Sequence, residues 1–312
     1  MARVRLLHLS DLHVALRLLR MRSSRFEAHI HHEAVRFVLG LGQQGIDAVL
    51  LGGDLGNSGW KEDLDEAKKY VTGPWPPGGI AWPSMSQVGK PLLMLPGNHD
   101  RFVAPWLATP GNREFDRVFN PTWTSGRGGV QTFLLPGDDQ PLLALVCADF
   151  TLAHEHDASH HAGHWGQGRV YPAVLKKLVA ETVRCRALPT APAVAWVVHF
   201  APEFPNLSST LQLIDEHDLT KAAAQNGIKY IFCGHTHIVG HGPSPTQPAV
   251  TIVCAGSVSC VNSGIDTSLH VLDFDVDAGQ IQRLARLDFY WQPGATPGTG
   301  TFVQKHSKPP WP

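Results

Sequence analysis

The sequence predicts an α/β protein in which two packed β-sheets are flanked by helices. Its first half alternates short apolar runs with amphipathic stretches, which is typical of β-α-β units with parallel strands. After residue 249 the apolar runs are separated only by turns, which indicates an antiparallel meander. Two sheets packed face to face, with the helices outside, satisfy both patterns.

The first half predicts strands at residues 3–9, 47–51 and 91–95, each an apolar run that ends in polar residues or glycine. Amphipathic helices are expected at 26–41 and 61–70, and the Pro-, Gly- and Trp-rich residues 72–89 are expected to form a surface connection.

The rest of the chain predicts a hairpin, three helices and further strands. The expected helices are a short one at 113–119 and longer ones at 172–186 and 207–226. The expected strands are 130–135, 142–150, 193–198, 229–233, 249–254, 257–261, 269–276 and 281–287. We expect one domain over residues 1–291, followed by a Pro- and Gly-rich tail over 292–312.

Composition limits the class of partner. The chain has 312 residues, 43% of them hydrophobic, and its formal net charge of −1 provides no general attraction to nucleic acid or to an anionic membrane. No apolar run is long enough to span a bilayer, and the first one is too short for a signal peptide. Five scattered cysteines indicate reduced thiols, so we expect a soluble, cytoplasmic protein of unspecified oligomeric state.

Polar residues follow five of the expected strands directly. Since the ends of these strands can meet at one edge of the fold, their side chains are expected to share one cleft. The clusters are Asp11 with His13, Asp54, Asn98 with His99, His199, and His235 with His237. Oxygen and imidazole ligands of this kind suit divalent Mn, Fe, Zn, Co or Ni.

The spacing within these clusters also favours metal binding. In Asp11-Leu12-His13 and His235-Thr236-His237 the polar residues are two apart, so an extended backbone directs both to the same side. Two metals held about 3.5 to 4 Å apart require a bridging ligand, and the Asp54 carboxylate can supply one.

Taken in order, the motifs resemble those of the calcineurin-like metallophosphoesterases. They are Asp11-Leu12-His13, Gly53-Asp54, Gly97-Asn98-His99-Asp100, His199 and Gly234-His235-Thr236-His237. The resemblance implies a four-layer αββα sandwich of two mixed sheets, and a first metal held by Asp11, His13, Asp54 and His237. It implies a second metal held by Asp54, Asn98, His199 and His235.

The resemblance also implies the chemistry. His99 would face the substrate and protonate the leaving oxygen, while Asp100 would orient its ring and raise its pKa. A hydroxide that bridges the two metals would be the nucleophile of a phosphoric ester hydrolase. The chain is similar to the bacterial cyclic-nucleotide phosphodiesterase branch, although Phe200 follows His199 where that branch usually has a second histidine.

Three functions are therefore open. A phosphodiesterase, with a cyclic nucleotide as the first candidate substrate, is preferred over a phosphomonoesterase or a pyrophosphate-ester hydrolase of the same fold. The alternative from another class is a non-catalytic metal-binding scaffold for a protein partner. The loops at 72–89 and 154–164 are expected to decide the substrate.

Other histidines are expected to have different roles. The histidine-rich stretch from His154 to His164 is expected to be a solvated loop near the cleft that contributes substrate contacts. His29, His31 and His32 are expected to be surface or capping residues at the start of the first helix.

Overall fold

Two six-stranded sheets pack against each other in the computed structural model, which describes residues 1–14, 27–42, 45–73, 84–102, 113–123, 129–136, 139–151, 166–260, 266–296 and 298–305. The first sheet has the order β14 (Gly300–Lys305), β13 (Gln280–Pro293), β12 (Ser268–Asp277), β1 (Ala2–Leu9), β2 (Ala48–Leu51) and β3 (Leu92–Met94). The second has the order β10 (Gly240–Pro243), β11 (Thr251–Cys254), β9 (Tyr230–Cys233), β7 (Ala193–Val198), β5 (Leu143–Ala148) and β4 (Val130–Leu135).

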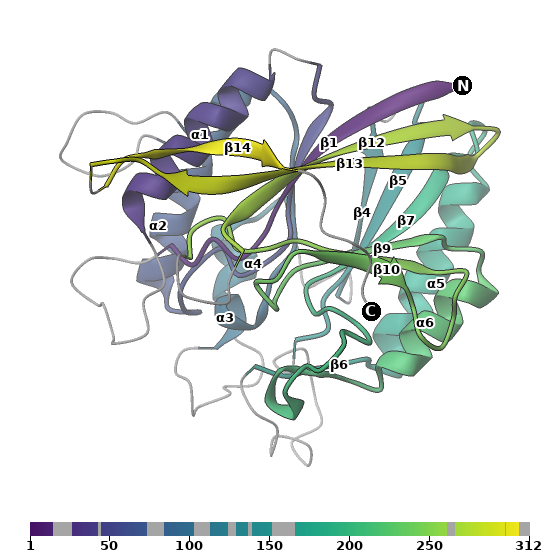
Figure 1. Ribbon diagram of the computed structural model, residues 1–312. Helices are drawn as coiled ribbons and strands as arrows, with labels where there is room; N and C mark the ends of the chain where they lie inside the picture. Colours follow the sequence, from purple (N-terminus) through teal and green to yellow (C-terminus); the bar gives the residue numbers. More distant parts are fainter. Residues whose placement is uncertain are drawn as a thin grey trace.

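The predicted β-α-β units form half of the first sheet. β1, β2 and β3 are parallel neighbours, with Leu6 opposite Ala48 and Val49 opposite Leu92. Their crossovers include α1 (Ala28–Gly42) and α2 (Lys61–Thr72), which lie on the outer side of this sheet in Figure 1. Parallel pairing places the carboxyl ends of the three strands, and the residues that follow them, at one edge.

The second sheet carries its helices on its opposite face. α5 (Pro172–Arg186) and α6 (Glu216–Gln225) cover it on the other side of the molecule (Figure 1). In β7, Ala193, Ala195 and Val197 join the core between the sheets, whereas Val194, Trp196 and Val198 join the core under the helices. This alternation is the period of two that a strand buried on both faces requires, so the predicted αββα arrangement is confirmed.

Several smaller elements complete the described fold. A short 3₁₀ helix, η2 (Met85–Val88), precedes β3, and α3 (Asn98–Arg101) and α4 (Glu114–Val118) follow it. A separate two-stranded sheet pairs β6 (Gly168–Arg169) with β8 (Leu213–Ile214).

The second half differs from the sequence prediction, which contained no strand at β6, β10 or β14. The helix expected at 207–226 begins only at Glu216, because the chain first forms the 3₁₀ helix η5 (Ser209–Leu211) and then β8, which pairs with β6. The strand expected at 257–261 is reduced to a single bridge between Ser257 and Thr267. The hydroxyls of Ser257 and Ser259 instead donate to the backbone of residues 11 and 12.

The expected tail contributes a strand. β13 continues to Pro293 and pairs antiparallel with β14, whose Phe302 is buried. The ring of Phe37 on α1 lies 4.8 Å from that of Phe289 and 5.9 Å from that of Phe302. Packing against α1 therefore gives this Pro- and Gly-rich segment an apolar face to bury, as far as residue 305.

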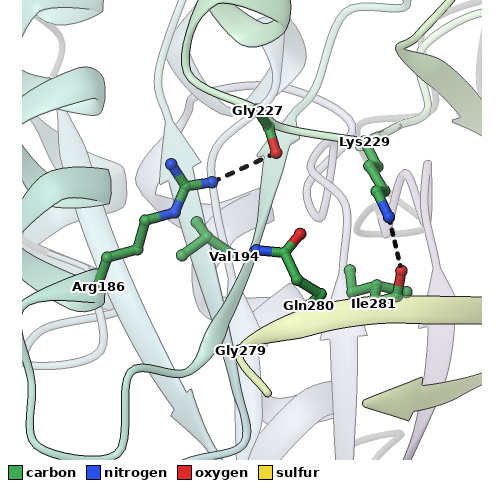
Figure 2. A pocket seen from close by; sticks show the side chains of 7 residues that line it. All are labelled: Arg186, Val194, Gly227, Lys229, Gly279, Gln280 and Ile281. Atoms are coloured by element: carbon green, nitrogen blue, oxygen red, sulfur yellow. Dashed lines mark hydrogen bonds between the residues drawn. The ribbon is translucent and has the colours of Figure 1, made fainter. Parts of the chain in front are cut away.

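Polar side chains at the amino edge of the strands connect neighbouring segments (Figure 2). Figure 2 shows Arg186 donating to the carbonyl of Gly227, at 3.3 Å, and Lys229 donating to the carbonyl of Ile281, at 3.3 Å. Arg186 also donates to the carbonyl of Asn226 at 2.6 Å. The hollow between them has a volume of about 10 Å³, which is room for one water at most. A wider groove of about 410 Å³ lies along the same edge, beside Ala2, Leu142, Pro192 and Asp277.

The cysteines and helices agree with two expectations from composition. All five cysteines are free thiols and buried. In the described part of the chain, every helix is too short or too polar to cross a membrane.

Candidate metal centre

The structure brings the predicted ligands together at the carboxyl edge of the strands. Three overlapping groups have side-chain ligand atoms within 4.8 Å of one another. These groups are Asp11, His13 and His237; Asp54, His199 and His235; and His13, Asp54 and His99. Asn98, the remaining predicted ligand, joins the second group through its amide oxygen, which lies 3.2 Å from Nε2 of His199.

The backbone at these residues is held in an unfavourable conformation. Five predicted ligands have positive φ, namely Asp11 at 55°, His13 at 49°, Asp54 at 52°, His235 at 69° and His237 at 57°. A non-glycine residue in this region costs on the order of 1 kcal/mol, and such strain persists where the surroundings over-determine it. Half of the non-glycine residues with positive φ in the described part of the chain are thus predicted ligands, which points to a functional site.

The first group converges on a single point. Nε2 of His237 lies 3.1 Å from both Oδ1 of Asp11 and Nε2 of His13, and Nε2 of His13 lies 3.9 Å from that same carboxylate oxygen. All three side chains are buried. Burial raises the pKa of Asp11, but the neighbouring His237 outweighs it and the net shift is downward, which keeps the carboxylate ionised.

The second group is oriented by backbone carbonyls. Nδ1 of His199 donates to the carbonyl of Gly52 at 2.8 Å, which leaves Nε2 directed at Asp54 Oδ2, 3.3 Å away. Nε2 of His235 lies 3.1 Å from the carbonyl of Leu211, so Nδ1 is its candidate ligand atom. A hydrogen bond on the second ring nitrogen is the usual way to fix a metal-binding imidazole.

Asp54 lies between the two groups. Its Oδ2 is 3.9 Å from Nε2 of His13 and 3.3 Å from Nε2 of His199, and its Oδ1 accepts the backbone N–H of His99 at 2.8 Å. Burial alone would raise the pKa of Asp54, but the adjacent histidines hold it well below its usual range. Burial likewise opposes protonation of His199, yet the charge of Asp54 raises the pKa of that ring to about 10. The shift is opposite for His13 and His235 in the same pocket, because burial lowers the pKa of both rings.

Two glycines allow this close approach. A Cβ on Gly97 would collide with the Asp54 side chain and lie 2.5 Å from its backbone nitrogen. Gly53 has a φ of 103°, and a Cβ there would meet the ring of His199. The Gly-Asp and Gly-Asn-His-Asp motifs therefore require glycine for space at both positions and for conformation at Gly53.

His99 and Asp100 differ in their surroundings. Nδ1 of His99 lies 2.8 Å from the carbonyl of Asn57, which supports the ring. The Asp100 carboxylate instead accepts backbone N–H groups from Leu55, Gly56 and Gly97. Burial first, and the charge of Asp54 second, raise the pKa of Asp100 to about 7. These contacts place Asp100 under the turns that carry Asp54 and Asn98, and the ring contact expected from the sequence is made by Asn57.

Phe200, the departure from the cyclic-nucleotide branch, is part of the support for the second group. Its ring centroid lies 5.2 Å from that of His199 and 4.7 Å from that of His235, and it is fully buried. The side chain therefore packs against two predicted ligands and provides no polar group to a substrate.

Two contributors were missed in the sequence. Arg101, on the same short helix as Asn98 and His99, is buried and donates to Asp149 at 2.7 Å and to Asp116 at 3.0 Å. Asp149 directly follows β5, so its position after a buried strand was an available signal. The ion pair fastens α3, next to the first sheet, to the end of a strand in the second.

His31 contradicts its assignment as a surface or capping residue. It is fully buried, and its Nε2 lies 2.9 Å from the carbonyl of Leu12, between two predicted ligands. His29 and His32 are only partly buried. The stretch from His154 to His164 and most of the connection at 72–89 lie outside the described residues.

The residues present fit two divalent metal ions. Oδ1 of Asp11 is fully buried against Nε2 of His237 and Nε2 of His13, and the ligand set combines carboxylate, amide and imidazole groups around a shared carboxylate. A cation at each group would satisfy these atoms and offset the mutual repulsion of the converging histidines.

The comparison with protein families agrees with this geometry. Residues 4–239 match the model of the calcineurin-like phosphoesterases. The chain belongs to this family. It is therefore a metal-dependent phosphoesterase, and its family implies divalent metal ions as cofactors and a phosphate ester as substrate.

Solved structures with similar folds have distant sequences. A dimetal phosphatase from Danio rerio is 11% identical with a TM-score of 0.57, and the match covers 96% of this chain and 98% of that one. The purple acid phosphatase PPD1 from yellow lupin is 12% identical with a TM-score of 0.56, covering 96% and 53%. GAP50, described as the anchor in the inner membrane complex of Plasmodium, is 11% identical with a TM-score of 0.53, covering 99% and 90%. No protein with a curated description matches this sequence.

Proposed function

We propose that the chain hydrolyses a phosphodiester at a binuclear metal centre. The observation that carries the proposal is the convergence of Asp11, His13, Asp54, Asn98, His199, His235 and His237 from five strand ends. Asp11, His13, Asp54 and His237 would hold one ion. Asp54, Asn98, His199 and His235 would hold the other, with Asp54 shared between them.

When bound, the metals would lower the pKa of a coordinated water, and their positive charge would stabilise the phosphate oxygens. The protein contributes preorganised ligands. Carbonyls of Gly52 and Leu211 orient His199 and His235, and the backbone N–H of His99 fixes one oxygen of Asp54. These contacts mean that little reorganisation is needed when the ions bind.

His99 is proposed to protonate the leaving oxygen. Its side chain is partly exposed, whereas the seven proposed ligands are buried. Its Nδ1 is engaged by the carbonyl of Asn57, so Nε2 is the nitrogen assigned to the substrate. Because His99 also belongs to one of the three possible metal groups, its role must be tested by metal content as well as by rate.

Asp100 is proposed to hold two backbone turns of the site together through hydrogen bonds. By accepting N–H groups from Leu55, Gly56 and Gly97 it joins the turn after Asp54 to the turn before Asn98. It thereby controls the spacing of the bridging carboxylate and the amide ligand. It also stays in place near the reacting centre without contacting the substrate.

The metals are proposed to be manganese or iron, with zinc, cobalt and nickel as alternatives, since the ligands are oxygen and imidazole groups. We further propose a cytoplasmic location, which the five free, buried thiols support. A small phosphate ester, with a cyclic nucleotide as first candidate, is the proposed partner, and nucleic acid is not favoured at a net charge of −1.

The experiment is a panel of phosphate esters assayed with added Mn²⁺. It contains bis(p-nitrophenyl) phosphate, p-nitrophenyl phosphate, a 3′,5′-cyclic nucleotide and a nucleoside diphosphate sugar, and Asp54→Asn is the matched control. Faster hydrolysis of diesters than of the monoester supports the proposal. Preference for the monoester or the pyrophosphate would replace the phosphodiesterase assignment, and absence of turnover on every ester would favour a scaffold.

A further inference from the structure

The loop that carries Asp11 and His13 is held by side chains outside the proposed ligand set. Nε2 of His31 lies 2.9 Å from the carbonyl oxygen of Leu12, and the hydroxyl of Ser259 donates to the same oxygen at 2.7 Å. The hydroxyl of Ser257 donates to the carbonyl of Asp11 at 2.8 Å. Consecutive carbonyls of the ligand loop therefore each accept side-chain donors.

The opposite side of the loop is fixed by the backbone. The N–H groups of Asp11 and His13 donate to the carbonyls of Gly53 at 3.0 Å and Asp54 at 2.9 Å. Donors and acceptors on both sides thus define the path of a loop in which both Asp11 and His13 have positive φ. Such a strained path requires contacts of this kind, because without them the residues would relax toward ordinary backbone angles.

His31 is itself rigidly supported. Its ring is fully buried and packs edge to face against Tyr70, with ring centroids 4.5 Å apart, and the Tyr70 hydroxyl donates to the carbonyl of His31 at 3.2 Å. Burial lowers the pKa of His31 to about 3, so the ring is neutral near pH 7. Since a carbonyl only accepts, the contact with Leu12 assigns the single N–H of the neutral ring to Nε2.

We propose that His31 and Ser259 are positioning residues that hold the Leu12 carbonyl and thereby set the geometry of the metal ligands Asp11 and His13. The proposal rests on the ligand assignment made above. It predicts a graded effect. The metal held by Asp11, His13, Asp54 and His237 should lose the most affinity. The second metal, which is joined to this loop by the shared Asp54 and by the His235 N–H that donates to Asp11 at 3.0 Å, should lose much less.

The test is Mn²⁺ binding to the full chain, measured by electron paramagnetic resonance titration. His31→Leu should weaken one of two binding events by about 10-fold or more and leave the other within about two-fold. His31→Gln, whose amide N–H has a similar reach, should restore most of the lost affinity. Ser259→Ala and Ser259→Thr form a second pair: Ser259→Ala should weaken the same Mn²⁺ site, and Ser259→Thr should retain most of the affinity. Ser259→Ala replaces His31→Leu as the test if His31→Leu fails to fold.

A buried histidine elsewhere provides the matched control. His270 is equally buried and its Nδ1 lies 2.7 Å from Oδ1 of Asp288. His270→Leu should reduce thermal stability and leave both Mn²⁺ affinities unchanged. Equal losses of affinity in His270→Leu and His31→Leu would show general destabilisation and overturn the proposal, as would equal behaviour of His31→Leu and His31→Gln.

The ligand assignment can fail separately. If Asp54→Ala retains both metals, the assignment itself is wrong. If Asp54→Ala loses them while His31→Leu and Ser259→Ala bind Mn²⁺ like the wild type, the centre stands and only the positioning role is wrong.

Discussion

The two edges of the same pair of sheets use polar side chains in opposite ways. At the amino edge, Arg186 and Lys229 extend to backbone carbonyls of neighbouring segments and enclose a hollow of about 10 Å³ (Figure 2). At the carboxyl edge, carboxylate and imidazole atoms converge on one another, and five of the residues that carry them have positive φ. Ala191 and Ala278 at the amino edge also have positive φ, so converging ligand atoms, rather than charge or backbone angle, distinguish the candidate metal-binding edge.

Cavity volume does not distinguish the two edges. The groove of about 410 Å³ at the amino edge has room for a small molecule. Its lining residues include no histidine, and no cluster of metal-ligand type lies there among the described residues. The converging ligand atoms, and not the volume of a groove, therefore locate the candidate active site. We expect the largest effects of substitution at the carboxyl edge.

The largest effect is expected from Asp54→Ala. Asp54 is the carboxylate shared by both proposed sites, so its removal should release both metals and abolish phosphoesterase activity. Inductively coupled plasma mass spectrometry after dialysis measures the metal content. A variant that keeps two ions per chain would show that Asp54 is not the bridge.

His99→Ala should reduce kcat by about 100- to 10,000-fold while the chain retains its metals, because a general acid contributes to the rate and not to metal affinity. The measurement combines steady-state kinetics on an aryl phosphodiester with metal analysis. If His99→Ala loses one metal ion as well as activity, His99 is a metal ligand. An unchanged rate would remove its proposed role altogether.

Both of these residues were predicted from the sequence because each motif lies in a contiguous stretch after an apolar run. The parallel strands β1, β2 and β3 were predicted for the same reason. His31 and Asp149 were missed because their importance arises from contacts with Leu12 and Arg101, 19 and 48 residues away in the chain. β6, β8, β10 and β14 were missed because they are short or lie beside Gly and Pro residues, so that each becomes a strand only through a partner that local patterns do not reveal.

Arg101→Lys is expected to have an intermediate effect. Lysine keeps the charge but lacks the several N–H donors of the guanidinium group, so it cannot make the same hydrogen bonds to Asp116 and Asp149. The attachment of α3 to the second sheet should therefore weaken. We expect kcat to fall by roughly 10-fold, since a small displacement of Asn98 and His99 impairs alignment. Kinetics and urea unfolding of Arg101→Lys measure this, with the exposed Arg184→Lys as the control. Equal kinetics in both variants would show that the anchor is only structural.

The smallest effect is expected at the amino edge. Arg186→Leu removes hydrogen bonds to the carbonyls of Asn226 and Gly227, so the free energy of unfolding should fall by about 1 kcal/mol. Activity and metal content should equal those of the wild type. A substantial loss of kcat in this variant would break the contrast between the two edges.

The position of the metals tests the account most directly. Crystals of the chain loaded with Mn²⁺ should give two anomalous difference peaks at the carboxyl edge, one beside Asp11, His13 and His237 and one beside Asn98, His199 and His235, with Asp54 between them. A single peak, or peaks bound to other residues, would contradict the binuclear centre.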